Sequence, residues 1–379
     1  MKKWFIIPAL SAVFSLSAVN PGDRPGETAA RLEWIDSSPV PMGVLNPEIH
    51  KNIPQLRAFV FMYTRAADSD RTITLLETLR RQNYENVLVS VITPDDPDDA
   101  REFRKKHKNV RVRLAADLER RLIPEYMRGG IMLFPMAFLM NSDGVILWRG
   151  EAVDLPEAVE LQLAGKLDPA TQKKIAPVIY KMQQYMRDGN MFKLYSTAQE
   201  ILQIDPANAS ALRMAVFAAE TLKQNGNAWK LTMQVMKARP DLPRVCFTAL
   251  DLTMRHPQCR PHLPELIRIF NQKPFPVGVR CAFITSLLNN FPFEAAAVAG
   301  AKEILASTPM PLASAPEQLG MILAVRSQLN YVLGNLRAAE ADIAEAVQYF
   351  QFAGAESSRV QAAKQLEYYR ALRKLAPER

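Results

Sequence analysis

The chain has 379 residues, which is enough for two or three domains that each bury a core. It carries 47 Lys and Arg against 39 Asp and Glu, a formal net charge of +8, with 48% hydrophobic and 23% charged residues. These values are ordinary for a globular protein and exclude bulk disorder, collagen and a multi-span membrane protein. The basic residues form no continuous stripe along the sequence, so we expect no nucleic-acid partner.

The first 19 residues look like a targeting segment and not like part of a fold. Lys2 and Lys3 precede an apolar run at 4–18, and the turn-forming sequence Asn-Pro-Gly follows at 20–22. This order is typical of a secretory signal peptide, so we expect 1–19 to be one and the protein to be exported to the periplasm or cell envelope. If left uncleaved, the segment would be the chain's only membrane contact, although about 15 apolar residues are fewer than the roughly 20 that span a bilayer.

Between about residues 33 and 167 the hydrophobic period alternates between two and 3.6, which indicates alternating strands and helices. We expect strands at Leu56–Thr64, Val87–Thr93, Val110–Leu114, Met136–Met140 and Val145–Trp148, and helices at Asp68–Gln82, Pro97–Lys108, Glu119–Met127 and Leu155–Leu163. The last two strands form a hairpin, because Asn141–Gly144 is a turn sequence. This order predicts a small three-layer α/β sandwich.

The helix expected at Pro97–Lys108 is acidic at its start and basic at its end. Asp96, Asp98 and Asp99 oppose the positive end of the helix dipole, and the basic run 104–108 lies at the negative end. We interpret these charges as a solvated helix face. A patch that meets an anionic surface is the alternative.

Three runs within this region resemble a family: Arg31–Gly43, Ala58–Leu79 and Phe134–Asp168. They are similar to thioredoxin-like redoxin domains, and more narrowly to exported bacterial thiol-disulfide oxidoreductases in which a helical extension follows the domain. The resemblance covers about residues 30–168. It implies an α/β thioredoxin-like sandwich.

In that family a strand leads to Cys-x-x-Cys at the start of the first helix, where the helix dipole and backbone N–H groups activate the first thiol. The matching positions here are Ala66, Ala67, Asp68 and Ser69, and the first cysteine of the chain is Cys246. Dithiol exchange at this site is therefore chemically impossible. We expect no catalytic residue, no cofactor and no enzyme activity.

Pro135 aligns with the family's cis-proline, which lies beside the active site and helps to hold an extended substrate segment. The resemblance therefore implies a cis Phe134-Pro135 bond, and Phe134, Pro135 and Met136 as a candidate peptide-binding site. The alternative is that the cis bond only closes the turn into the following strand.

After Asp168 the strand patterns stop and prolines separate helical segments, which indicates helix pairs over 169–379. Pro206 and Pro240 are 34 residues apart, the period of tetratricopeptide repeats. Gly-Asn pairs at 189–190 and 334–335 are expected helix-to-helix turns. We therefore expect a tetratricopeptide-like helical repeat domain, which the stretch 257–276 fits poorly. Such arrays usually bind peptides or proteins.

The cysteines and histidines of this half allow several interpretations. Cys246, His256, Cys259 and His262 lie within 17 residues, and zinc uses such ligands, but the spacing matches no usual zinc pair. We expect no metal site. A Cys246–Cys259 disulfide and free thiols both stay open.

Two functions of different classes follow. The first is an exported, redox-inactive thioredoxin-like protein with helical repeats, which acts as an adaptor or scaffold for protein or peptide partners. The second is a thiol-disulfide oxidoreductase that uses Cys246, Cys259 or Cys281 in place of the missing pair.

Overall fold

The structure is a computed structural model that describes residues 20–25, 32–35, 39–40, 45, 54–83, 85–120, 122, 126 and 134–375. The expected signal peptide at 1–19 lies outside the described residues. The chain divides into two compact units, with the boundary between Ala215 and Val216. We describe the N-terminal unit first and the C-terminal unit separately.

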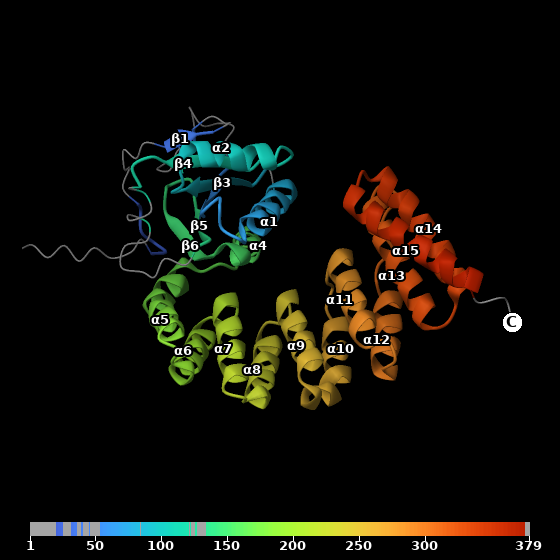
Figure 1. Cartoon of the computed structure of the whole chain (residues 1–379). Helices are drawn as coiled ribbons and strands as arrows, with labels where there is room; N and C mark the ends of the chain where they lie inside the picture. Colours follow the sequence, from blue (N-terminus) through green and yellow to red (C-terminus); the bar gives the residue numbers. More distant parts are fainter. Residues whose placement is uncertain are drawn as a thin grey trace, which may run out of the picture. The chain divides into compact units, whose positions relative to one another are not determined.

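A six-stranded mixed sheet forms the centre of the N-terminal unit, with the strand order β1-β4-β3-β2-β5-β6 (Figure 1). β2, β3 and β4 run parallel, whereas β1 pairs antiparallel with β4, β5 with β2, and β6 with β5. The strands are β1 (Leu32–Trp34), β2 (Leu56–Phe61), β3 (Val87–Thr93), β4 (Arg113–Asp117), β5 (Met136–Met140) and β6 (Ile146–Glu151).

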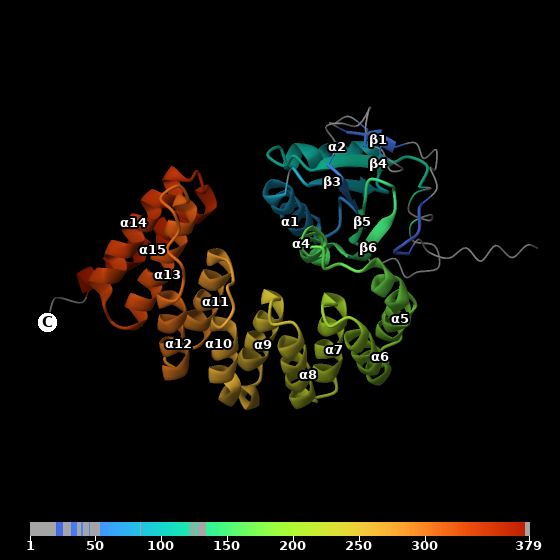
Figure 2. The same cartoon turned by 180° about the vertical axis from the view of Figure 1, so that it is seen from behind.

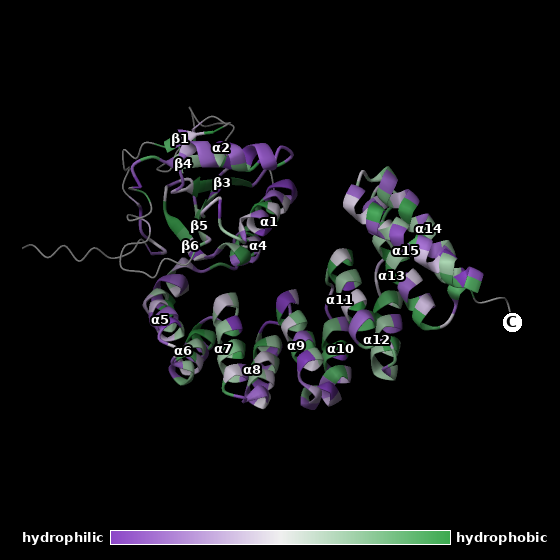
Figure 3. Cartoon of the chain, viewed as in Figure 1, coloured by the Kyte–Doolittle hydropathy of each residue, from purple (hydrophilic) through white to green (hydrophobic). Residues whose placement is uncertain are grey.

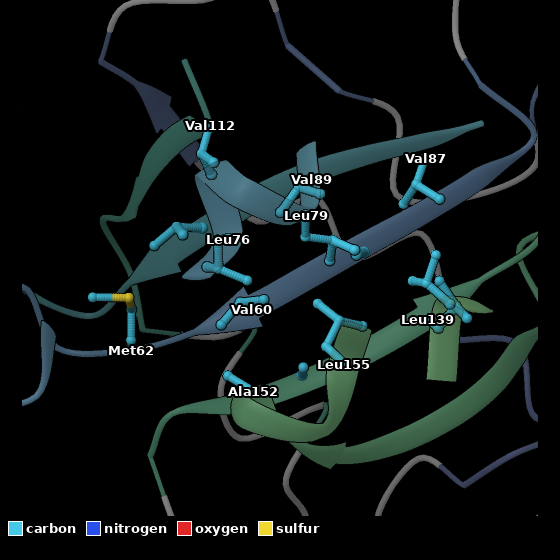
Figure 4. Packing of buried hydrophobic residues seen from close by; sticks show 14 of the residues in the cluster. Val60, Met62, Leu76, Leu79, Val87, Val89, Val112, Leu139, Ala152 and Leu155 are labelled. Atoms are coloured by element: carbon cyan, nitrogen blue, oxygen red, sulfur yellow. The ribbon is translucent and has the colours of Figure 1, made fainter. Parts of the chain in front are cut away.

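Successive side chains of a strand point to opposite faces of the sheet. Those on one face pack against three helices. They are α1 (Ser69–Gln82), α2 (Pro97–Lys106) and α4 (Leu155–Leu163), which follows the short turn η1 (Ala152–Asp154). Figure 4 shows Val60 and Val89 of the sheet packed against Leu76 and Leu79 of α1 and Leu155 of α4. This cluster is the larger of the two cores of the unit.

The opposite face carries a second, aromatic core. Phe61 of β2 contacts Tyr126 and Phe138, with ring centroids 5.2 and 5.6 Å apart, and Leu122 joins the same cluster. The side chains of Leu122 and Tyr126 are both buried in this aromatic core.

Of the helix expected at 119–127, the structure describes Glu119, Arg120, Leu122 and Tyr126, and the other five residues lie outside the described residues. Glu119 and Arg120 lie in a turn, closed by the hydrogen bond from the N–H of Arg120 to the carbonyl of Asp117. The expected start of the helix at Glu119 is therefore wrong, whereas Leu122 and Tyr126 are helical.

The α/β order agrees with the expected sandwich, but the bounds of several elements differ. β2 ends at Phe61 instead of Thr64, and β6 spans Ile146–Glu151 instead of Val145–Trp148.

β4 begins at Arg113 instead of Val110, because the carboxylate of Glu77 accepts hydrogen bonds from the backbone N–H groups of Arg111 (2.8 Å) and Val112 (3.2 Å). These two residues therefore precede the strand. β1 was not expected as a strand; it has three residues and adds to the sheet edge beside β4.

The helical region begins directly after the α/β elements. α5 (Pro169–Arg187) is capped by Asp168, whose carboxylate accepts from the N–H groups of Ala170 and Thr171, and α6 (Met191–Ile204) and α7 (Ala209–Thr221) follow. Arg213 of α7 donates to Glu151 (2.8 Å) and Asp154 (3.0 Å) at the end of the sheet. This ion-pair network ties the start of α7 to the α/β elements of the N-terminal unit.

The C-terminal unit is helical, and its helices follow one another in chain order (Figures 1 and 2). They are α8 (Asn225–Ala238), α9 (Pro243–Arg255), the 3-10 turn η2 (Pro257–His262), α10 (Leu263–Asn271), α11 (Val277–Asn290), α12 (Ala295–Ala306), α13 (Pro316–Val332), α14 (Leu336–Phe352) and α15 (Glu356–Leu375).

The expected turn signals separate helices in both units. Gly189 lies between α5 and α6 and Gly334 between α13 and α14, each with a positive φ that glycine adopts without strain. The stretch expected to fit a repeat poorly, 257–276, holds η2 and the short helix α10. The chain is therefore an α/β domain with a mixed sheet, followed by a helical region.

Candidate functional site

The four positions that the resemblance matches to Cys-x-x-Cys, 66–69, form a turn between β2 and α1. Ala66 is half-buried, Ala67 and Asp68 are exposed, and Ser69 is the first residue of α1 and is buried. The N–H of Ser69 donates to the carbonyl of Ala66 (3.1 Å), which closes the turn. The start of a helix lowers the pKa of a thiol, but two methyl groups, a carboxylate and a hydroxyl occupy these positions. None of them can form a mixed disulfide.

An aspartate that the sequence analysis did not single out holds this turn in place. Asp95, which follows β3, accepts hydrogen bonds from the N–H (2.6 Å) and the hydroxyl (2.7 Å) of Thr64 and from the hydroxyl of Thr93 (3.1 Å). Arg65 forms an ion pair with Asp99 in the first turn of α2. The segment ahead of α1 is thus fixed to the neighbouring strand and helix.

The candidate peptide-binding residues Phe134, Pro135 and Met136 have different environments. The Phe134-Pro135 bond is cis, as expected. The carbonyl of Pro135 accepts from the N–H of Ala152 (3.0 Å), and Met136 is buried and paired with β2 on one side and β6 on the other. The backbone of Met136 is therefore occupied by the sheet, whereas Phe134 and Pro135 lie ahead of the strand.

Phe134 forms an aromatic pair with Tyr63, a residue that the sequence analysis did not propose. The ring centroids are 4.8 Å apart and the rings meet edge to face. Tyr63 is 43% exposed, and its carbonyl lies 3.4 Å from the N–H of Ala66, which donates to it. The structure thus brings Phe134 to the turn at 66–69 through Tyr63. The sequence signal for this pair is an aromatic residue, Tyr63, that shortly follows the apolar run of β2.

The three cysteines lie in the C-terminal unit, and all are free and buried. Burial raises the pKa of Cys246 to about 12 and that of Cys281 to about 11. Burial, and the nearby charge of Glu220, also raise the pKa of Cys259. At neutral pH these side chains are thiols, whereas exchange with a disulfide needs a thiolate.

The structure does not bring together the Cys and His residues weighed as zinc ligands. The sulfur of Cys246 lies 3.7 Å from that of Met236, His256 lies 2.5 Å from a carboxylate oxygen of Glu220, and His262 stacks on Trp229 with ring centroids 5.1 Å apart. Across the described residues, no group of three or more His, Cys, Asp and Glu side chains is placed to hold a metal ion.

Among the hollows that the described residues line, two of the larger ones lie one in each unit. The first, about 680 Å³, lies in the N-terminal unit between the sheet and α5, and is lined by Asn20, Pro21, Asp23, Met136, Arg149, Gly150, Gln172, Lys173, Ala176, Pro177, Ile179, Tyr180, Lys181, Gln183 and Gln184. The second, about 560 Å³, lies in the C-terminal unit and is lined by Gly226, Trp229, Lys230, Met233, Gln234, Lys237, Gln258, Cys259, His262 and Glu265. Met136 is the one candidate peptide-binding residue that lines either of them.

No helix in the described part of the chain is both long and apolar enough to span a membrane. No protein-family model matches the sequence, and no curated protein matches it. Among solved structures, the crystal structure of StoA from Bacillus subtilis is similar at 18% identity with a TM-score of 0.24. The match covers 28% of this chain and 83% of StoA. A similarity of this size carries no argument about fold or function.

Proposed function

We propose that the protein is an exported, redox-inactive adaptor whose thioredoxin-like domain and tetratricopeptide-like helical array hold protein or peptide partners. The observation that carries this proposal is the turn at 66–69. It begins a helix beside an aromatic pair, the exposed Tyr63 and the half-buried Phe134, yet no position in it carries a thiol. A site with this shape and without its nucleophile can bind a chain but cannot exchange disulfides with it.

The thioredoxin-like assignment is supported by the order of the elements. β2, α1, β3, α2 and the β5–β6 hairpin follow one another as the resemblance implies, and the hairpin turn lies at 141–144. The repeat assignment is supported by the helix pairs and by the turn glycines Gly189 and Gly334.

The oxidoreductase alternative is disfavoured by the environment of the cysteines. Cys246 and Cys281 are buried, and their raised pKa values keep them protonated at neutral pH. A catalytic thiol needs both access to its substrate and a lowered pKa.

A reductase assay tests the first part of the proposal, that the protein does not reduce disulfides. The protein is mixed with insulin and dithiothreitol, and we expect the rate of insulin reduction to equal that of dithiothreitol alone. A faster rate that disappears when Cys246, Cys259 and Cys281 are all changed to Ser would overturn the proposal in favour of the alternative.

Photo-crosslinking tests the binding half. A photoreactive phenylalanine analogue is placed at residue 63 in cells, and the same analogue is placed at residue 118 as the matched control. Tyr63 and Leu118 are similarly exposed, 43% and 47%, and both lie in the N-terminal unit. We expect discrete protein adducts from position 63 and not from position 118. Equal adducts from both positions, or none from 63, would contradict a binding surface at the aromatic pair.

A further inference from the structure

A basic hollow lies on the α/β domain, and its lining includes none of the residues of the candidate site. It has a volume of about 490 Å³ and is lined by Glu77, Arg80, Arg81, Lys108, Asn109 and Arg111. The first three come from α1 and the last three from the loop between α2 and β4. These six residues are called the basic hollow below.

Glu77 is the only acidic residue of the basic hollow, and its carboxylate is already engaged. It accepts hydrogen bonds from Arg80 (2.7 and 3.0 Å), from Arg81 (3.1 Å) and from the backbone of Arg111 and Val112. The lining therefore carries four cations against one anion. Within the described residues, the exposed side chains of Lys108 and Arg111 have no hydrogen-bond or ion-pair partner, so their charges remain available.

The surroundings of the basic hollow hold most of the chain's excess charge. The segment 101–113 contains seven Lys and Arg and one Glu, a net charge of +6, whereas the whole chain has +8. The dipole of α2 explains cations in its last turn. The dipole of α1 likewise explains Arg80 and Arg81 in its last turn, but neither dipole explains Arg111, which lies between α2 and β4. The sequence alone could not show that these groups converge.

The residue composition around the basic hollow favours a surface of anionic groups, and not a protein, as its binding partner. Figure 3 shows α2 mostly in purple, the hydrophilic end of the scale. Among the described residues from 64 to 117, no large hydrophobic side chain is one of the exposed ones. Protein interfaces are built around apolar and aromatic anchors, whereas headgroup binding needs a cluster of Lys and Arg and few apolar contacts.

We propose that the basic hollow binds the phosphate of anionic phospholipid headgroups and so docks the α/β domain on a membrane surface. The inference rests on the proposed function in one respect: export of the protein decides which membrane surface the basic hollow meets. This membrane contact is separate from the one that residues 1–19 would make if they are left uncleaved.

Vesicle flotation of the full chain tests the proposal. The probes are phosphatidylcholine vesicles with and without phosphatidylglycerol, so that any binding through residues 1–19 appears with both. The test variant is Lys108→Gln with Arg111→Gln, which leaves the hydrogen bonds of Glu77 in place. The matched control is Lys302→Gln with Lys364→Gln, which removes the same charge from exposed positions of α12 and α15.

We expect phosphatidylglycerol to strengthen binding of the parent and of the control. The test variant should bind phosphatidylglycerol vesicles about 25-fold more weakly, from a factor of about five per basic residue. No preference of the parent for phosphatidylglycerol, or equal binding by the two variants, would overturn the proposal. Binding of millimolar inorganic phosphate to the parent and not to the test variant, together with no preference of the parent for phosphatidylglycerol vesicles, would show a site for free phosphate instead of lipid and would also overturn the proposal. Because crosslinking at residue 63 does not involve these side chains, failure here is distinguishable from failure of the adaptor proposal.

Discussion

The ring of Phe134 meets the ring of Tyr63 edge to face, with centroids 4.8 Å apart, and this contact joins two segments 71 residues apart in the chain. Tyr63 lies just after the end of β2, and Phe134 lies just before the start of β5. The carbonyl of Tyr63 in turn accepts from the N–H of Ala66. The aromatic pair and the turn at 66–69 therefore form one surface, whose geometry does not depend on any thiol.

The first prediction is that this turn accepts a disulfide when cysteines are introduced. The hydrogen bond from Ser69 to the carbonyl of Ala66 closes a turn whose end Cα atoms lie within about 7 Å. A disulfide needs about 4.4–6.8 Å. In Ala66→Cys with Ser69→Cys, both new thiols should disappear on mild oxidation while the three native ones remain, as measured by thiol titration in denaturant.

The control pair is Ala67→Cys with Thr78→Cys. Both positions are exposed, but α1 separates them by more than about 13 Å at 1.5 Å per residue. Its thiols should stay titratable in the monomer. If the pair at 66 and 69 also stays reduced, the turn does not have the geometry described here.

Strong local patterns made much of the fold predictable. β3, β5 and α4 have the expected bounds, because each is a continuous apolar run or an amphipathic stretch bounded by turn residues. α2 begins as predicted at Pro97 but ends two residues early, at Lys106. The run of basic residues that follows it has no hydrophobic period that could mark the end of the helix.

Features that depend on contacts between distant residues could not be predicted. The start of β4 is set by the carboxylate of Glu77, some 35 residues earlier in the chain. The three residues of β1 are too few to show a period, and their pairing with β4 comes from the fold. At the candidate site, the sequence supplied Phe134 and the turn at 66–69, but not Tyr63 or Asp95, because only the folded chain places them beside the turn.

The second prediction concerns the native cysteines. With pKa values of about 12 and 11, Cys246 and Cys281 should have only trace thiolate at pH 7, and both side chains are buried. Iodoacetamide should therefore label the folded protein at these positions far more slowly than it labels the protein in denaturant, as followed by mass spectrometry of peptides. Labelling of either cysteine at the same rate in both states would show an accessible thiolate and revive the oxidoreductase alternative.

The third prediction concerns Arg280, which is 3% exposed and connects three segments of the C-terminal unit. Its guanidinium donates to Asn271 (2.8 Å), Thr308 (3.0 Å) and the carbonyls of Lys273 and Ile304 (both 3.1 Å). A lysine cannot reach this divergent set of acceptors. Arg280→Lys should lower the free energy of unfolding by about 1–3 kcal/mol, the cost of leaving buried polar groups unsatisfied.

Urea denaturation monitored by circular dichroism measures this loss. Arg187→Lys is the control, because Arg187 is exposed and its one ion pair, with Asp188, spans 3.8 Å. We expect that control to match the parent. Equal stability of Arg280→Lys and the parent would mean that the hydrogen bonds around Arg280 do not hold α10, α11 and the end of α12 together.

The last prediction is a pH dependence that originates at Glu77. Burial alone would raise the pKa of this carboxyl, but hydrogen bonds from Arg80, from the backbone of Arg111 and from Arg81 outweigh burial and lower it to about 2, from 4.5. A carboxyl whose pKa is lower in the folded state stabilises the fold fully above about pH 4.5. That stabilisation declines as the pH falls from about 4.5 toward 2, because over this range the unfolded state binds a proton that the folded state does not yet take up.

Glu77→Gln should therefore be less stable than the parent at pH 7 by about 1.5–3 kcal/mol, the range for hydrogen bonds to a charged group. The difference should shrink as the pH falls from 5 to 2, when measured by urea denaturation at each pH. Glu102→Gln is the matched control, since Glu102 is exposed on α2 and should show little difference at any pH. If the free energy of unfolding of Glu77→Gln stays below that of the parent by the same amount across this pH range, the charge of Glu77 does not hold the loop ahead of β4 against α1. The packing of its side chain would then do so.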